Sequence, residues 1–130
     1  MTKALLAALI ALSLSQLLSA AEPPAERFED FRALAHQMGE TEEGKAYEKQ
    51  FGKTFAKPMQ VALQDCSRDT KPPYTVNVVF VIGSDGTTQR ILAAPNQPVS
   101  ACVTKKLNGL KLPRPPKPDW LVLVNITITE

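Results

Sequence analysis

Two cysteines, Cys66 and Cys102, are the side chains of this 130-residue sequence best suited to covalent chemistry. A nucleophilic cysteine or serine needs a histidine and an orienting acid beside it. The only histidine is His36, within a stretch of helical pattern, and no Gly-x-Ser-x-Gly segment occurs. If the two cysteines form a disulfide, neither is available as a nucleophile. We therefore expect a protein that is not an enzyme.

Metal binding is the second chemistry that these residue types allow. Imidazole and thioether groups are suitable copper ligands, and His36, Met38 and Met59 could supply them. The three residues follow no recognised ligand spacing, and helical periodicity already explains the methionines as core positions. The sequence therefore predicts no metal site and no cofactor.

The first 21 residues have the pattern of an export signal. Lys3 precedes an apolar run, which ends in the small residues Ser19-Ala20-Ala21. Cleavage after Ala21 would leave 109 of the 130 residues, enough for one domain. The alternative is an uncleaved anchor, because residues 4–21 approach the length of a membrane span. The polar residues within that run favour a cleaved leader, so we expect a periplasmic or secreted bacterial protein without stable membrane insertion.

Export would place the two cysteines in an oxidising compartment, where lone pairs of cysteines most often form a disulfide. Cys66 and Cys102 are 36 residues apart, and loop entropy assigns such a bond about 3–4 kcal/mol. A small domain benefits from a cross-link because it buries a limited share of its surface.

The charge of the mature chain is close to neutral. Loss of Lys3 leaves 14 of the 15 lysines and arginines against 13 acidic residues. A nucleic-acid-binding domain would normally be far more basic. This class of function is therefore excluded.

The front of the mature chain predicts helices. Apolar residues recur at three- and four-residue steps up to Met38, and Gly39 is a natural stop. Thr41 is placed to cap a second helix. Pro58 either kinks this second helix or begins a third one. The residues expected on the inner faces are Phe28, Phe31, Tyr47, Phe51, Phe55, Met59, Ala62, Leu63 and Cys66.

The second half changes to strand periodicity. Residues 74–82 alternate, with a half-apolar second face that is typical of an interior strand. A turn at 83–86 leads into a second strand at 87–93, so the two form a hairpin. A short helix capped by Asn96 follows. An extended proline-rich segment from Pro113 to Pro118 then leads into a last strand at 120–130.

These elements predict an α+β fold with N-terminal helices followed by a β-β-α-β unit, a small antiparallel sheet and one disulfide. The expected organisation is a leader at 1–21, a helical segment at 22–57 and an α+β domain at 58–130.

The second half resembles the C-terminal domains of TonB and TolA. It is most similar to the two-cysteine module at the C-terminus of AgmX-type gliding-motility proteins. The matching residues are Cys66, Ser84-Asp85-Gly86, Cys102-Val103 and Leu112-Pro113, with Leu112 where that family usually has Phe. The resemblance covers about residues 58–130. It implies a fold and a style of binding, but not energy transduction, because the chain has almost no spacer.

The unpaired edges of such a sheet are candidate binding sites, since they offer backbone groups to an extended segment of a partner. The candidate edges are the strands at 87–93 and 120–130. The alternative is that the front helices cover both edges.

A basic segment around the prolines is a second candidate surface for an acidic partner. Trp120 would be its aromatic anchor. The alternative is a stiff connector with Trp120 packed inside. The residues of this candidate surface are Arg90, Lys105, Lys106, Lys111, Arg114, Lys117 and Trp120.

The expected function is an exported, non-catalytic protein-interaction module. It would be an accessory or an inhibitor of an envelope protein or machine. The alternative is a small-ligand or metal-binding periplasmic protein with a pocket between the front helices and the sheet. The sequence leaves the partner and the oligomeric state open.

Overall fold

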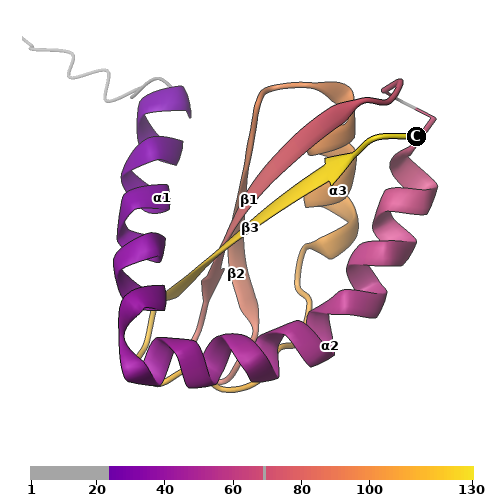
Figure 1. The fold of residues 1–130 in the computed structure, drawn as a ribbon. Coiled ribbons are helices and arrows are strands. Elements are labelled where there is room, and N and C mark those ends of the chain that lie inside the picture. Colours follow the sequence, from indigo (N-terminus) through magenta and orange to yellow (C-terminus); the bar gives the residue numbers. More distant parts are fainter. Residues whose placement is uncertain (1–23, 69) are drawn as a thin grey trace, which may run out of the picture.

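The computed structural model describes residues 24–68 and 70–130, so the expected leader lies outside the described residues. The element order confirms the predicted α+β class, with two helices followed by a β-β-α-β unit (Figure 1). The elements are α1 (Pro24–Glu40), α2 (Glu42–Cys66), β1 (Tyr74–Ile82), β2 (Thr88–Ala94), α3 (Pro98–Leu107) and β3 (Trp120–Ile128).

The three strands form one antiparallel sheet in the order β2-β1-β3. β1 is therefore the central strand, which explains why both of its faces are largely apolar. It pairs with β3 over its whole length, from Tyr74 opposite Ile128 to Ile82 opposite Trp120. Its pairing with β2 is shorter and shifts in register between Val81 and Ile82.

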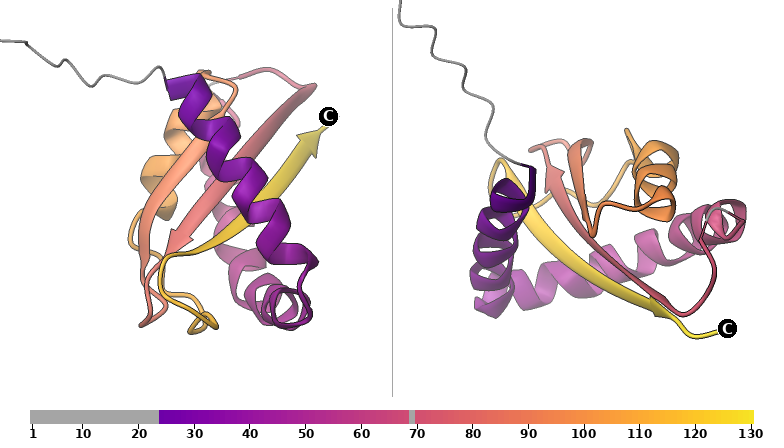
Figure 2. Two further views of the ribbon diagram at one scale, coloured as in Figure 1. Left: turned by 90° about the vertical axis from the view of Figure 1, so that its left-hand side faces the viewer. Right: turned by 90° about the horizontal axis from the view of Figure 1, so that it is seen from above.

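Helices cover both faces of the sheet. α1 packs on one face, and α2 and α3 pack on the other, so the domain has three layers (Figure 2). The face under α1 is the smaller core, in which Phe28 and Ala35 contact Val79, Val81 and Leu121.

The larger core lies between the sheet and the two other helices, and aromatic side chains dominate it. The ring of Phe51 meets Phe80 edge-on at 5.5 Å, and Tyr47 meets Trp120 edge-on at 6.1 Å between centroids. Such tilted pairs are a favourable geometry for aromatic rings. The predicted core positions of Tyr47 and Phe51 are confirmed.

The corner between α1 and α2 is built by Thr41, as the sequence predicts. Its Oγ1 accepts a hydrogen bond from the Gly44 amide at 3.0 Å and donates one to the Met38 carbonyl at 2.7 Å. A Cβ at Gly44 would collide with that Met38 carbonyl, so the tight corner requires glycine there.

α2 continues through Pro58 as one bent helix (Figure 1), which decides between the two alternatives left by the sequence. It thereby crosses the expected boundary between residues 57 and 58. Tyr47 and Phe51 before that boundary, and Met59 after it, belong to one hydrophobic cluster. The helical segment and the sheet therefore share a core.

The start of α3 differs from the expectation that Asn96 caps it. The N-cap residue is Gln97, whose side chain makes no capping hydrogen bond and instead donates to the Thr75 carbonyl at 3.0 Å. Pro98 occupies the first turn, where its fixed φ and missing amide hydrogen are tolerated. The proline therefore sets the boundary of α3.

The predicted disulfide is confirmed: Cys66 at the end of α2 is bonded to Cys102 in α3. It cross-links two helices that lie on the same face of the sheet. None of the helices in the described part of the chain is long and apolar enough to cross a membrane.

The proline-rich connection from α3 to β3 is anchored where the prolines begin. The Leu112 amide donates to the Gly86 carbonyl at 2.8 Å, and the Tyr47 hydroxyl donates to the Pro113 carbonyl at 2.8 Å. Gly86 has a φ of 89°, which favours glycine, so the hairpin turn and the connection fit together only with this residue.

Candidate partner-binding site at the sheet edge

The strand order makes β2 and β3 the two edges of the sheet, and these are the two strands that the sequence put forward. Natural proteins protect sheet edges by short strands, charges, irregular register or a covering segment. The two edges can therefore be compared by these features.

The outer edge of β2 is protected by a charge, by irregular register and by a covering segment. The strand has seven residues, it carries Arg90, and its pairing with β1 is irregular. The connection to β3 covers its beginning, where the Thr88 amide donates to the Leu110 carbonyl at 3.0 Å and Lys111 lies opposite Thr87. This edge is partly closed by the chain itself.

The outer edge of β3 is covered only near its beginning, where the Leu121 amide donates to the Met38 sulfur of α1 at 3.3 Å. The strand has nine residues of sequence WLVLVNITI, without charge or proline, and it pairs with β1 without interruption. Within residues 24–68 and 70–130, no strand pairs with its outer side. β3 lies in front of the other two strands in the view of Figure 1. It is thus a long, regular and uncharged edge.

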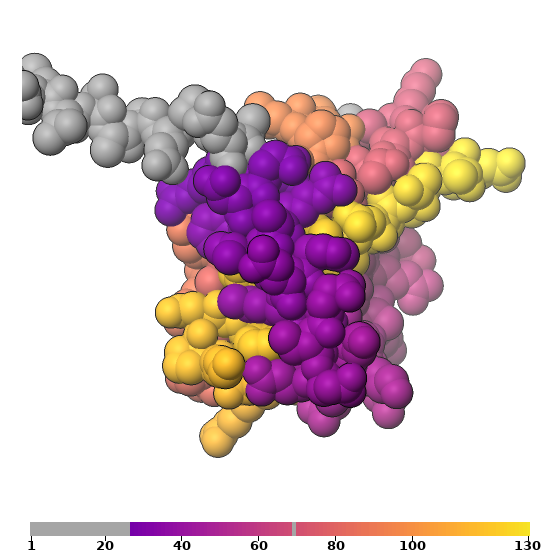
Figure 3. Space-filling model, turned by 60° about the vertical axis from the view of Figure 1, so that its left-hand side comes forward, coloured from indigo at the N-terminus to yellow at the C-terminus, as the bar shows by residue number. Residues whose placement is uncertain are grey.

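The second half of β3 extends beyond the helix that covers its first half. The yellow C-terminal part of the chain emerges from beneath α1 in Figure 3. Val124, Ile126 and Ile128 are half-buried there and point to the side of α2, while Asn125 and Thr127 on the other side are exposed. The two sides of this edge therefore differ in polarity.

A surface hollow of about 440 Å³ lies where α1 meets the polar side of β3. Glu29 and Arg32 on its wall form an ion pair at 3.6 Å, and Asn125 contributes from the strand. His36 also lines the hollow and has Glu40 at 3.8 Å. Polar side chains of a bound segment would meet hydrogen-bonding groups on this side.

The structure does not bring the expected basic surface together. Lys117 forms an ion pair with Glu43 at 3.4 Å. Lys111 lies near Asp85, whose pKa is lowered mainly by its hydrogen bonds with Thr87 and slightly by this lysine. Lys117 is therefore paired with a carboxylate of its own chain, and Lys111 lies near another.

The other members of that surface are dispersed as well. Trp120 is 3% exposed and packs in the core, which is the second of the two alternatives. The Arg90 guanidinium lies over the ring of Phe31 in α1, at 5.5 Å from its centroid. Lys106 pairs with Asp65 across α2 and α3, and Lys105 and Arg114 are exposed. The proline segment thus acts as a connector that seats Trp120.

The three potential copper ligands are not brought together either. His36 is exposed on α1, and Met59 is buried on the opposite face of the sheet. The sulfur of Met38 accepts a hydrogen bond from the Leu121 amide at 3.3 Å. Their positions are those of a surface residue and two packed side chains.

The aromatic and aliphatic cores described above fill most of the space between the front helices and the sheet, where a pocket was expected, and the hollow of about 440 Å³ between α1 and β3 lies at the margin of that space. A larger cavity lies instead between α2 and α3, where Val61, Leu107 and Leu110 line it. Sequence reasoning missed these residues as a site. The available signal was Val61, an apolar residue outside the inner face predicted for its helix.

This chain has no match among protein-family models, curated proteins or solved structures. The resemblance to the TonB and TolA domains therefore stays a prediction from the sequence.

Proposed function

We propose that this chain is an exported, non-catalytic protein-interaction module of the bacterial envelope. It binds an extended segment of a partner protein as a fourth strand along the outer edge of β3. The observation that carries this proposal is the nine-residue, uncharged and uninterrupted β3, whose outer side pairs with no strand of the described chain.

Strand addition uses the backbone for affinity and alternate side chains for specificity. A partner segment next to β3 would place every second side chain beside Val124, Ile126 and Ile128, and these should be apolar. The intervening side chains would face Asn125 and the hollow beside α1, and these should be polar. The preferred ligand is therefore an extended segment in which apolar and polar residues alternate.

Two features support the envelope as the location. The first 21 residues have the pattern of an export signal, and the disulfide suits an oxidising compartment. The partner is accordingly another envelope protein, for which this domain is an accessory or an inhibitor. The resemblance to the TonB and TolA domains fits such a role.

The experiment is site-specific photo-cross-linking in cells that export the tagged full-length chain. A photoreactive residue replaces Asn125 on β3 or, as the matched control, Gln89 on β2, because both side chains are exposed on edge strands. We expect one dominant envelope protein to be captured from Asn125 and not from Gln89.

Hydrogen exchange of the purified complex then tests the binding mode. Amides in the second half of β3 should become protected, and the double variant Asn125→Lys, Thr127→Lys should lose the partner because lysines block edge pairing. Capture through Gln89 instead, or a complex without added protection in β3, would contradict the proposal.

A further inference from the structure

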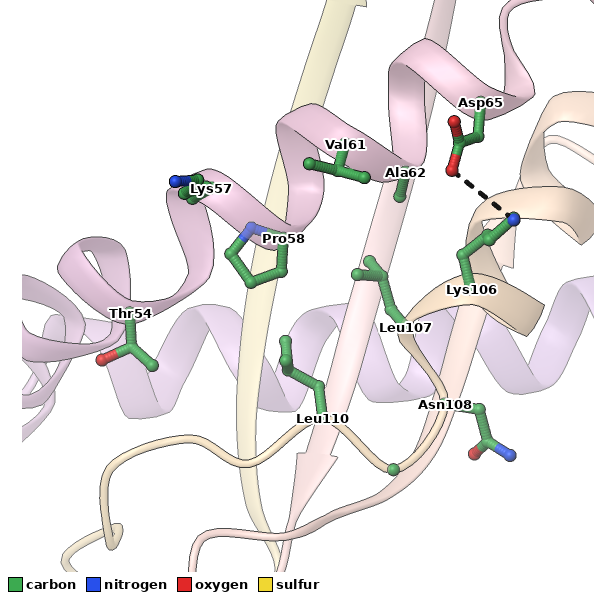
Figure 4. Close-up of a pocket in the computed structure, with 11 residues that line it drawn as sticks. Thr54, Lys57, Pro58, Val61, Ala62, Asp65, Lys106, Leu107, Asn108 and Leu110 are labelled. Atoms are coloured by element: carbon green, nitrogen blue, oxygen red, sulfur yellow. Dashed lines mark ion pairs between the residues drawn. The ribbon is translucent and has the colours of Figure 1, made fainter.

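An open groove separates the second half of α2 from the end of α3, on the opposite face of the sheet from α1 (Figure 4). Its volume is about 720 Å³. Its apolar lining comes from both helices and from the turn that follows α3: Pro58, Val61, Ala62, Leu107 and Leu110.

Val61 is the side chain that distinguishes this groove from an ordinary crevice. It is 47% exposed, and only Leu34 is a comparably exposed large apolar side chain among the described residues. Leu34 belongs to α1 and does not line the groove. The apolar surface at Val61 is instead continuous with Leu107 and Leu110 across the gap.

The two walls of the groove are fixed relative to each other. The Cys66–Cys102 disulfide joins α2 to α3, and Asp65 pairs with Lys106 at 3.5 Å across one end of the groove (Figure 4). A ligand therefore meets a preformed site and does not have to bring the helices together.

Pro58 adds a polar feature to the same wall. Proline has no amide hydrogen, so the carbonyl of Thr54, four residues earlier, lacks its usual helical donor. Positions four apart share a helix face, and both residues line the groove. Figure 4 shows the proline ring on the side that faces Leu110. The wall thus combines apolar side chains with a point at which the helix lacks one backbone amide donor.

The charge on the rim indicates the occupant. Lys57 lines the groove and forms no ion pair within residues 24–68 and 70–130, whereas Lys106 at the other end is paired with Asp65, so the lining has a net positive charge that comes from Lys57. Asp65 is the single carboxylate of the lining. A ligand with carboxylates beside an apolar surface would complement this rim.

We propose that the groove is a second docking site, which binds an amphipathic helix of a partner protein with an apolar face flanked by carboxylates. The wall from Thr54 to Asp65 is about 16 Å long, which matches about three helical turns. The groove is open along its length, so it covers one face of a helix and leaves the opposite, polar face in water. An open groove of this kind would leave much of a bound lipid chain exposed to water. This site is independent of the β3 edge.

The test uses a fluorescein-labelled 14-residue peptide held helical by a side-chain staple. Leucines form one face and glutamates flank them, and a matched peptide carries lysines in place of the glutamates. Fluorescence anisotropy with the oxidised protein should show saturable binding of the glutamate peptide and at least tenfold weaker binding of the lysine peptide. Chemical shift changes should be confined to residues around Val61 and Leu110.

Variants locate the binding. Val61→Asp should weaken the glutamate peptide at least tenfold, and Lys57→Glu should weaken it about threefold. Leu34→Asp is the matched control, because Leu34 is equally exposed at 48%, and it should leave the affinity unchanged. Circular dichroism verifies that each variant is folded.

Three results would overturn the inference. They are no saturable binding of the glutamate peptide, equal binding of both peptides, and equal losses from Val61→Asp and Leu34→Asp. Saturable binding of dodecanoate in the groove without binding of the peptide would also overturn it. The peptide should still bind the Asn125→Lys, Thr127→Lys variant, since the two sites are separate.

Discussion

Reduction of the Cys66–Cys102 disulfide should destabilise the domain strongly, and the structure allows the size of the effect to be worked out. The bond closes a loop of 36 residues that contains β1, β2 and their hairpin turn. The chain-entropy relation assigns such a loop about 3.8 kcal/mol at 25 °C. Since domains of this size have about 5–15 kcal/mol in total, the bond accounts for a large share of the stability.

The assay is urea denaturation of the mature protein, followed by circular dichroism with and without a phosphine reductant. We expect the free energy of unfolding to fall by about 3–4 kcal/mol on reduction. The thermal midpoint should fall by at least 12 °C, since each kcal/mol shifts a domain of about 100 residues by about 4 °C or more.

A variant with both cysteines replaced by alanine separates the cross-link from the packing of the sulfur atoms. Cys66 has no exposed surface, so its truncation should cost about 1 kcal/mol more than reduction alone. A loss under about 1 kcal/mol in the reduced wild-type protein would refute the loop-entropy argument. It would mean that residual contacts between the α2 and α3 segments already restrict this loop in the unfolded ensemble.

Three further predictions test single contacts of the fold. Gly86→Ala should cost at least about 2 kcal/mol in urea denaturation, because its φ is left-handed and a Cβ would meet the Leu112 carbonyl; an unchanged midpoint would contradict this. Gly44→Ala should destabilise, whereas the control Gly52→Ala, which has open space at its Cβ, should stabilise α2 by about 0.5–1 kcal/mol; equal effects of the two would be the contrary result. Burial raises the pKa of Tyr47 to about 12, so its phenol stays neutral in the folded state while the unfolded one ionises near pH 10. The free energy of unfolding should therefore fall as the pH rises from about 10 to 12, and Tyr47→Phe should remove this part of the fall while costing about 1 kcal/mol at pH 7.

The sequence predicted those parts of the fold that local patterns encode. The alternation in residues 74–82, the capping residue Thr41 and the turn at 83–86 each depend on a few neighbouring residues, and all three are confirmed. The disulfide was predictable because the pattern of an export signal indicates an oxidising compartment and two lone cysteines allow a single pairing.

Other features depend on contacts between distant segments. α2 stays continuous through Pro58 because side chains on both sides of the proline pack into one core, which overrides the local preference for a break. The side chain of Gln97 reaches the Thr75 carbonyl of β1, more than twenty residues away, and no local pattern contains that contact. The start of α3 itself has a local signal, Pro98, which the choice of Asn96 as the cap overlooked.

The choice between the two sheet edges depends on long-range contacts in the same way. The sequence named both strands, but the protection of β2 comes from residues 110–112, which return from the far end of α3. The groove between α2 and α3 was not predicted, because its two walls are about fifty residues apart in the chain and meet only after folding.

The proline segment links these observations. Its composition suggested a binding surface, yet its Pro113 carbonyl accepts a hydrogen bond from the Tyr47 hydroxyl within the domain. Residues 110–112, just before the segment, bond to Thr88 and Gly86 and cover the beginning of β2, and Trp120, just after it, lies in the core where β3 begins. The connection from α3 to β3 therefore covers part of one edge strand and leads directly into the other. If a partner pairs with β3 as proposed, we expect the prolines to influence binding only indirectly, through the path of this connection.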